Sequence, residues 1–415
     1  MSEPPVPFFS PRLFDEDRET ALRLIHEIGT APEQRFILGA HTRALEDALS
    51  ARLAGAHVVA CGSGTSALTM ALAALGVGRG DEVVVPALGC APLASAPLAL
   101  GATPVFADVD PVTLTLDPGA AERAVTPRTR ALVPAHLFST MADMPRFREL
   151  AGHHGLRLLE DSAVAQGAVL GGTPAGLWGE AGIFSFVQVK TFGLPGEGGV
   201  VVTHDAELAA HVRLSRNHGQ AEGERFTHRL VGHNSRFDEI QARLALHRLP
   251  GLDARLARRA ELVDAYTESL APLAERGVVA PRPGRDGRCG YVYTVLADDR
   301  DALADRLRAE GVETHVYYPR PLPHHAAFAP FAAPGARWPV AESAAARMLS
   351  LPLHPGLTDA QLARVVDGVR RFAERAPAPS PGPSGRPRPD QPPSPARRFT
   401  PGRSPVPHSP EASPR

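Results

Sequence analysis

The chain has 415 residues, of which 43% are hydrophobic and 21% charged, and its formal net charge is −1. This balance favours neither nucleic acid nor a membrane as a partner, and no apolar run is long enough to predict a transmembrane helix. The N-terminus lacks the basic and apolar regions of a secretory signal. The cysteines Cys61, Cys90 and Cys289 contain no CxxC pair. We therefore expect no disulfide framework, no metal site and a cytoplasmic protein.

Short apolar strands alternate with helices over the first half of the chain. A helical period over 38–55 precedes a strand at 57–61, a glycine-containing turn at 62–66 and a helix at 67–75. Further strands are predicted at 81–86, 103–109, 130–136, 157–161, 182–186 and 198–203, with a small-residue helix around 90–100. Such alternation predicts an α/β fold with a parallel or mixed sheet and helices on both faces.

The pattern changes after Arg236. Segment 236–277 is long, helical and rich in arginine, and a strand at 290–297, a helix at 301–311, a strand at 312–319 and a helix at 358–374 follow. We predict a large domain over 1–255, with an irregular lead-in over 1–20, and a small C-terminal α/β domain over 256–375. Residues 376–415 contain 14 prolines and 6 serines, which predicts a disordered tail.

One lysine stands out in the composition. Of the 44 basic residues other than histidine, Lys190 is the single lysine and 43 are arginine. A primary amine can lose its proton and form an imine, which a guanidinium does not do. Lys190 could have survived by chance on the surface, but it lies between two apolar strands and next to a glycine-rich turn. This position favours an active-site lysine.

Two other stretches carry groups that complement a lysine. The turn GSGTS (62–66) joins a strand to a helix, where free backbone N–H groups suit a phosphate, although it could also be a plain turn. Asp161 ends an apolar strand, at the usual ligand edge of an α/β sheet, although it could also be a helix cap. A lysine, a carboxylate and a phosphate site together are what pyridoxal phosphate requires.

The sequence resembles the DegT/DnrJ/EryC1/StrS family of sugar aminotransferases, from about residue 8 to 375. The resemblance rests on many motifs in order. They include RFILGAHTRALEDALSARLAG (35–55), GSGTSAL (62–68), GDEVVVPAL (80–88), EDSAVAQGA (160–168), FSFVQVKTFGLPGEGG (184–199), RNHGQ (216–220) and GHNSRFDEIQARL (232–244). It implies a fold-type I pyridoxal phosphate transferase, with a mostly parallel seven-stranded sheet and a smaller C-terminal domain.

The resemblance also implies roles for individual residues. Lys190 would hold the cofactor as an imine, and Asp161 would pair with the pyridinium nitrogen. The phosphate would be held by Gly64, Thr65 and Ser185, and by Asn234 of a neighbouring subunit, which implies a homodimer with shared active sites. Weaker assignments to the substrate are His218, Arg236, His324 and His325.

Two positions depart from the family pattern. Cys90 replaces the usual aromatic residue that stacks on the cofactor ring, and Val164 replaces a glutamine or histidine near the ring hydroxyl. Gln166 could compensate for Val164. The 17 histidines show no metal-ligand spacing, so we assign His153 and His154 to the surface or to packing.

The sequence therefore predicts an aminotransferase that takes an amino group from an amino acid, most simply L-glutamate. The acceptor would be a 3- or 4-keto-6-deoxy sugar on a nucleoside diphosphate, in aminodeoxysugar or natural-product biosynthesis. Two alternatives stay open: a keto-cyclitol acceptor, or a catalytically silent regulatory homologue, which Cys90 and Val164 motivate.

Overall fold

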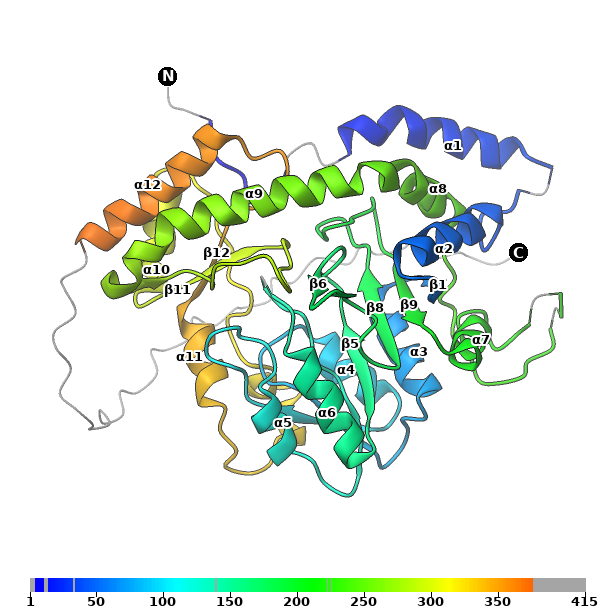
Figure 1. Ribbon diagram of the computed structural model, residues 1–415. Helices are drawn as coiled ribbons and strands as arrows, with labels where there is room; N and C mark the ends of the chain where they lie inside the picture. Colours follow the sequence, from blue (N-terminus) through cyan, green and yellow to red (C-terminus); the bar gives the residue numbers. More distant parts are fainter. Residues whose placement is uncertain are drawn as a thin grey trace, which may run out of the picture. The chain divides into compact units, whose positions relative to one another are not determined.

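Seven strands form one central sheet. The computed structural model describes residues 4–10, 14–32, 34–138, 140–221, 223–224 and 226–375. Its main sheet has the order β1-β9-β8-β5-β4-β2-β3, and Figure 1 shows β1, β9, β8 and β5 of this sheet. All neighbours pair in parallel except β9, which is antiparallel to both β1 and β8. The mostly parallel seven-stranded sheet is therefore confirmed. Its strands are β1 (His57–Cys61), β2 (Glu82–Pro86), β3 (Thr103–Ala107), β4 (Thr129–Leu132), β5 (Arg157–Asp161), β8 (Ala181–Ser185) and β9 (Gly199–Thr203).

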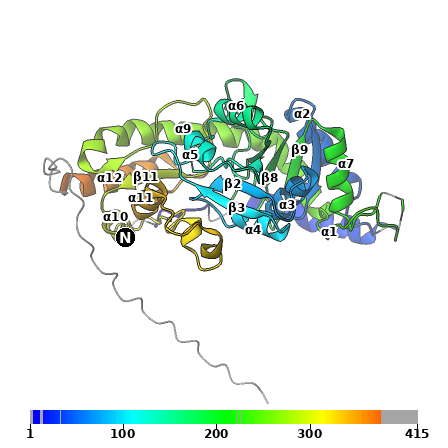
Figure 2. The same ribbon diagram turned by 90° about the horizontal axis from the view of Figure 1, so that it is seen from below.

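Helices cover both faces of this sheet because successive strand side chains point to opposite sides. Val59 and Cys61 of β1 join the core under α3 (Gly64–Ala74), α4 (Pro92–Ala99) and α7 (Ala206–Ser215). Val58 and Ala60 join the opposite core, under α2 (Ala40–Arg52), α5 (Pro118–Arg123), α6 (Met144–His154) and α8 (Glu239–Arg248). The two layers are visible in Figure 2. Helix α1 (Arg18–Thr30) packs against α8.

The long helix α9 (Leu252–Leu270) leads into the C-terminal part (Figure 1). There a three-stranded antiparallel sheet, in the order β10-β11-β12, shares a separate core with α9, α10 and α12. These elements are β10 (Val278–Val279), β11 (Tyr293–Ala297), α10 (Arg300–Ala309), α11 (Pro339–Arg347), β12 (Met348–Leu351) and α12 (Asp359–Arg375). The short 3₁₀ helices are η1 (Asp15–Asp17), η2 (Leu249–Gly251), η3 (Ala271–Arg276), η4 (Leu322–His324) and η5 (Ala329–Phe331).

The strand predicted at 312–319 is wrong. Only isolated bridges occur there, from Val312 to Val6 and from His315 to Ser350. The third strand of the small sheet is β12, which pairs with β11 over its whole length. The run 312–319 satisfies the alternation of a strand, but the partner of β11 is supplied by a segment about thirty residues later. The hairpin of β6 (Val169–Leu170) and β7 (Thr173–Pro174) and the helix α1 had no sequence prediction.

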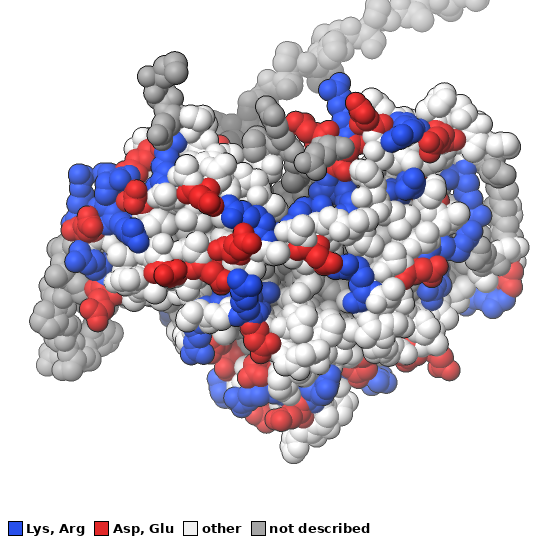
Figure 3. Space-filling model, turned by 45° about the horizontal axis from the view of Figure 1, so that its top comes forward, with Lys and Arg blue, Asp and Glu red and all other residues white. Residues whose placement is uncertain are grey.

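The described residues lie within one compact unit, Met1–Ala378. The boundary at residue 256 between a large and a small domain stays a prediction, and the predicted disordered tail, 376–415, lies outside the described residues. No helix in the described part of the chain is long and apolar enough to cross a membrane. On the face in Figure 3, basic and acidic side chains are interspersed, in keeping with the net charge of −1.

Candidate active site

The predicted catalytic residues meet at one edge of the main sheet. Strands β1, β5 and β8 run in parallel, so their carboxyl ends, Cys61, Asp161 and Ser185, lie along the same edge. Strand β9 runs the other way and starts at this edge, with Gly199 paired to both Cys61 and Ser185. The chain between β8 and β9, which carries Lys190, therefore begins and ends at the edge where Asp161 lies.

The turn from β1 to α3 forms a close-packed pocket wall with Ser185. Ser63 caps α3, and its hydroxyl accepts a hydrogen bond from the Ser66 N–H at 3.1 Å. A Cβ atom on Gly64 would lie 2.8 Å from the Ser185 Cβ, and one on Gly199 would lie 2.7 Å from the Gly64 nitrogen. Glycine is therefore required for this approach. The first-turn N–H groups of a helix have no intrahelical acceptor, so Gly64 and the exposed Thr65 can donate to an anion.

Asp161 is a buried carboxylate. Its side chain is 4% exposed, and its Oδ1 accepts a hydrogen bond from the Ala163 N–H at 3.1 Å. Burial raises the pKa of Asp161, while the Ala163 N–H and the nearby Lys190 cation oppose this rise. A cationic ligand group placed against Asp161 would remove the cost of burying its charge. A protonated pyridine nitrogen is such a group.

Lys190 lies beside the same carboxylate. Its backbone N–H donates to the Val187 carbonyl at 2.8 Å, and its Nζ lies 4.8 Å from the centre of the Tyr291 ring. Burial raises the pKa of the Cys90 thiol to about 12; the Asp161 charge raises it further and the Lys190 charge lowers it. Lysine, carboxylate and thiol thus share one small region, and at this pKa the Cys90 thiol is neutral.

Sequence reasoning missed two tyrosines beside Lys190 and a third beside Cys90 and Asp161. Tyr291 and Tyr317 share a side-chain hydrogen bond, and burial raises the pKa of both to about 12. Burial also raises the pKa of Tyr318 well above its usual value, with Cys90 and Asp161 among the neighbouring titratable groups. Their sequence signal was GYVY (290–293) and VYYP (316–319), which we interpreted only as strands. These tyrosines supply neutral aromatic surface near the position where Cys90 replaces an aromatic residue.

Val164 and Gln166 follow Asp161 but occupy different surroundings. Val164 is 4% exposed, and its carbonyl accepts the Thr191 hydroxyl at 3.1 Å. Gln166 donates from Nε2 to the Ser185 carbonyl at 3.4 Å, and its buried Oε1 has no partner among the described residues. Gln166 also lines a hollow together with Leu256. Gln166 donates to the backbone carbonyl of Ser185, whose hydroxyl belongs to the candidate phosphate site. That Gln166 takes the place of the polar side chain missing at Val164 therefore stays a prediction.

The remaining candidates lie outside this cluster. Asn234 is exposed and accepts a hydrogen bond from the Arg236 Nε at 3.0 Å, and its backbone bridges to Asn217. His218 donates its backbone N–H to the His233 carbonyl at 2.9 Å. The structure brings none of these three predicted residues into a described contact with Lys190 or Asp161.

His324 and His325 belong to another region. The His324 Nε2 lies 3.4 Å from a Glu342 carboxylate oxygen, and the ring centre of His325 lies 6.4 Å from that of Phe328. Their role as substrate contacts stays a prediction. The pair His153–His154 ends α6 and stacks edge to face at 4.8 Å, away from the sheet edge that carries Lys190.

The residues present fit pyridoxal phosphate. A phosphate can face the Gly64–Thr65 turn and the Ser185 hydroxyl, a pyridinium nitrogen can face Asp161, and Lys190 supplies the amine. By contrast, no group of three His, Cys, Asp or Glu side chains in the described part of the chain is arranged to hold a metal ion.

The model of the DegT/DnrJ/EryC1/StrS aminotransferase family matches residues 17–370. The chain belongs to this family. Its members are pyridoxal phosphate-dependent aminotransferases, so the predicted family, cofactor and enzyme class are confirmed.

Individual relatives bear out this assignment. The chain is 42% identical over 336 residues to the UDP-N-acetyl-3-dehydro-alpha-D-glucosamine 3-aminotransferase of Acidithiobacillus ferrooxidans, covering 81% of this chain and 89% of the relative. It is 41% identical over 341 residues to the dTDP-3-amino-3,4,6-trideoxy-alpha-D-glucose transaminase of Streptomyces venezuelae, covering 82% and 89%. The crystal structure of S. venezuelae DesV in complex with a ketimine intermediate superposes with a TM-score of 0.85 at 40% identity, covering 90% of this chain and 100% of that one.

Proposed function

We propose that this enzyme transfers an amino group from L-glutamate to a keto sugar carried on a nucleoside diphosphate. The observation that carries the proposal is the convergence of Lys190, Asp161 and the Gly64–Ser185 wall at one sheet edge. The acceptor class follows from the two relatives above, both named for a nucleotide-linked 3-amino sugar. A 3-keto sugar is therefore favoured over a 4-keto sugar. The product would enter aminodeoxysugar biosynthesis in the cytoplasm, in keeping with three free cysteines.

Each residue has a physical task. Pyridoxal phosphate, when bound, supplies an electron-withdrawing ring that stabilises negative charge at the substrate carbon. Asp161 holds a proton on that ring by its buried charge. The Lys190 amine would be the base and acid that moves a proton at the reacting carbon. The Gly64–Thr65 backbone and the Ser185 hydroxyl hold the phosphate and so fix the orientation of the cofactor.

The uniqueness of Lys190 makes the test sharp. We would add pyridoxal phosphate to the purified protein, record its absorption spectrum and reduce a separate portion of the sample with borohydride. In the wild type we expect a visible imine band and, after reduction, an adduct on Lys190. In Lys190→Ala and Lys190→Arg we expect no such imine band and no side-chain adduct. Lys190→Arg keeps the cation and is the matched control. In the portion that is not reduced, L-glutamate should bleach the wild-type band.

The acceptor is tested in the same sample. After the glutamate step, a dTDP- or UDP-linked keto sugar should restore the band, whereas an inosose should not. Restoration by the inosose alone would favour the cyclitol alternative. Absence of any band in the wild type would refute the enzyme proposal and favour the regulatory alternative that Cys90 and Val164 motivate.

We further propose a homodimer that shares its active sites. Large apolar side chains are exposed on α1, where Leu22 and Ile25 are 62% and 50% accessible, and after α7, where Phe226 and Val231 are 75% and 96% accessible. Exposed apolar surface of this kind favours contact with a second copy. Asn234 is exposed on the same post-α7 segment, so it is available to a partner subunit.

Subunit mixing tests this arrangement. If Asn234 serves the partner's site, Lys190→Ala and Asn234→Ala subunits complement each other, because one of the two sites in a mixed dimer is intact. Random exchange would then restore about a quarter of the wild-type activity. If each subunit completes its own site, the mixture shows no more than the mean activity of the two variants.

A further inference from the structure

The Lys190 amine faces the ring of a tyrosine to which the proposed chemistry gives no task. The Lys190 Nζ lies 4.8 Å from the centre of the Tyr291 ring. This distance is within the range of cation–π contacts, in which the negative face of an aromatic ring attracts a cation. A contact of this kind stabilises an ammonium group and does nothing comparable for a neutral amine.

The hydroxyl end of Tyr291 is held by a second tyrosine. Tyr291 and Tyr317 share a side-chain hydrogen bond, and their ring centres lie 6.4 Å apart. Tyr317 is itself stacked on His315, with 5.8 Å between the ring centres. Burial raises the pKa of Tyr291 to about 12, so its ring is uncharged at neutral pH. The contact with Lys190 is therefore made by the face of a neutral ring, and it is not an ion pair.

The backbone of Tyr291 is held by a buried arginine of α9. The Arg259 Nη1 donates to the Gly290 carbonyl at 2.9 Å and to the Tyr291 carbonyl at 3.2 Å. It also donates to the Leu353 carbonyl at 2.9 Å. One guanidinium group thus ties the segment that carries Tyr291 to α9 and to the chain that follows β12.

A purely structural link would not need a charge at this position. Arg259 is 7% exposed and has no carboxylate partner among the described residues, and its buried Nε has no hydrogen-bond acceptor there. Burial lowers the pKa of Arg259 to about 10, because the surroundings disfavour its charge. A buried charge without an opposite charge costs stability. What the arginine contributes in return is the fixed position of the Tyr291 segment.

We propose that Tyr291 is a further catalytic residue and that Arg259 is its positioning residue. The inference rests on the proposed function, in which the neutral Lys190 amine takes a proton from the reacting carbon. The C–H bond breaks, its electron pair stays with the substrate, and the Lys190 nitrogen carries the proton as an ammonium group until it returns it. The Tyr291 ring stabilises this ammonium group and not the amine, so it favours the transfer of the proton.

A double-mutant cycle on the apo-enzyme tests the contact itself. Urea unfolding is compared for the wild type, Lys190→Met, Tyr291→Leu and the combined variant, because coupling between two residues appears as non-additivity. We expect a coupling of about 2- to 30-fold in the unfolding equilibrium constant, which is the range of cation–π contacts. In the matched cycle with Tyr291→Phe, which keeps the ring, the coupling should nearly vanish. No coupling in the first cycle, or equal coupling in both, would overturn the role of the ring.

The kinetics of the glutamate half-reaction test the catalytic role. In the holoenzyme at saturating L-glutamate, the imine band of Tyr291→Leu should bleach about 2- to 30-fold more slowly than that of the wild type. Tyr291→Phe should stay close to the wild-type rate. Glutamate deuterated at Cα should slow Tyr291→Leu at least as much as the wild type, because the affected step breaks the Cα–H bond.

The results that contradict the catalytic role are distinct from a failure of the proposed function. A wild-type rate in Tyr291→Leu, or a loss of rate without the isotope effect, would overturn the inference. A failure of the proposed function would instead appear as wild-type enzyme that L-glutamate does not bleach. The double-mutant cycle needs neither cofactor nor substrate, so it reports on the contact in either case.

The positioning role of Arg259 is tested in the same half-reaction. Arg259→Met should lose as much rate as Tyr291→Leu, and the combined variant should lose no more than either, because the two residues act as a unit. Arg259→Lys keeps a cation that can donate to carbonyls and should restore part of the rate. Arg300→Met is the matched control and should keep the wild-type rate, since Arg300 also donates to backbone carbonyls, at 3.4 and 3.2 Å, without a described contact to Tyr291.

Additive losses, or a wild-type rate in Arg259→Met, would overturn the positioning role. If Arg259→Met does not fold, Arg259→Lys takes its place. It must then itself be slower than the wild type and non-additive with Tyr291→Leu, and additive losses would again contradict the positioning role.

Discussion

Replacing Gly64 with alanine tests the assignment of the β1–α3 turn as the phosphate site. The new Cβ would lie 2.8 Å from the Ser185 Cβ and 3.2 Å from its Oγ, whereas carbon atoms in contact are separated by about 3.5–4.0 Å. Ser185 ends a strand that is paired on both sides, so it cannot move freely. Helix α3 must shift by roughly 1 Å, and overpacking of this kind costs about 1–3 kcal/mol.

The same displacement moves both donors of the proposed phosphate site. If the whole cost of about 1–3 kcal/mol falls on cofactor binding, the Kd of pyridoxal phosphate rises roughly 5- to 150-fold. Titration of the apo-enzyme with cofactor, followed by absorbance, measures this change, and urea unfolding of the apo-enzyme measures any loss of stability. Gly78→Ala is the control, because a Cβ there meets nothing within 4 Å. Wild-type cofactor affinity in Gly64→Ala would refute the assignment, whatever its stability.

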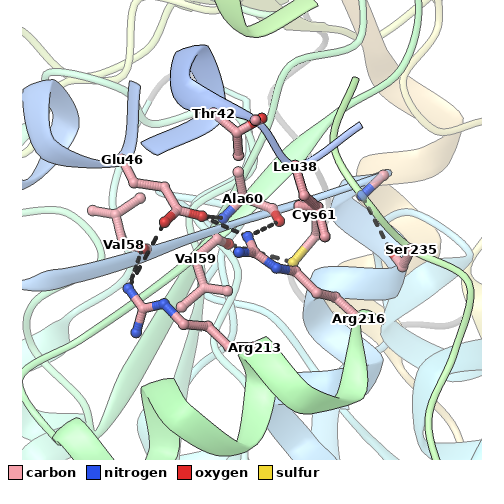
Figure 4. Close-up of polar contacts among 12 residues, drawn as sticks. Leu38, Thr42, Glu46, Val58, Val59, Ala60, Cys61, Arg213, Arg216 and Ser235 are labelled. Carbon is pink, nitrogen blue, oxygen red and sulfur yellow. Dashed lines mark hydrogen bonds and ion pairs between the residues drawn. The ribbon is translucent and has the colours of Figure 1, made fainter. Parts of the chain in front are cut away.

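Two further substitutions give distinct readouts. Glu46→Gln leaves the guanidinium group of Arg216, which is 8% exposed, without its carboxylate partner (Figure 4). Urea unfolding should therefore show a loss of about 3–5 kcal/mol in the free energy of unfolding. The control Asp253→Asn breaks an exposed pair with Arg52 and should lose no more than about 1 kcal/mol, so equal losses would contradict the argument. Asp161→Asn should abolish most transamination yet stabilise the apo-enzyme at pH 7. Burial raises the folded pKa of Asp161, so its ionisation costs stability as pH rises above about 3.9, the unfolded pKa. The gain in unfolding free energy of the variant over the wild type should therefore be smaller at pH 4.5. A wild-type apo-enzyme that is more stable than Asp161→Asn at pH 7 would refute the reasoning.

The local pattern of apolar residues was sufficient to predict the strands of the main sheet. Apolar runs of about five residues, separated by helical periods, predicted each of its strands to within a few residues. The predicted positions of Asp161, Ser185 and Lys190 gain their meaning from the parallel pairing, which brings carboxyl ends together at one edge. Periodicity alone does not give the order of the strands or the reversal of β9. Those came only with the structure.

Contacts between segments that lie far apart in the chain could not be predicted from the sequence. The tyrosines at 291, 317 and 318 come from two segments of the C-terminal part, and nothing in their spacing shows that they gather around Lys190, Cys90 and Asp161. The segment 312–319 failed for the same reason, since strand pairing depends on a partner that local pattern does not identify.

The reversal of β9 has a consequence for how the enzyme can change. Because β9 pairs antiparallel with β8, the segment carrying Lys190 is a hairpin connection anchored at both feet by the Ser185–Gly199 pair, with no crossover helix. The free energy of closing a loop rises slowly with its length, by about 0.6 kcal/mol for a doubling. A change in the length of this connection would therefore add little to the free energy of loop closure, but it would displace the buried Phe192 and Leu194 and carry the only side-chain amine of the protein away from Asp161. The packing of this connection, more than the pairing of the strands, holds the reactive amine in place.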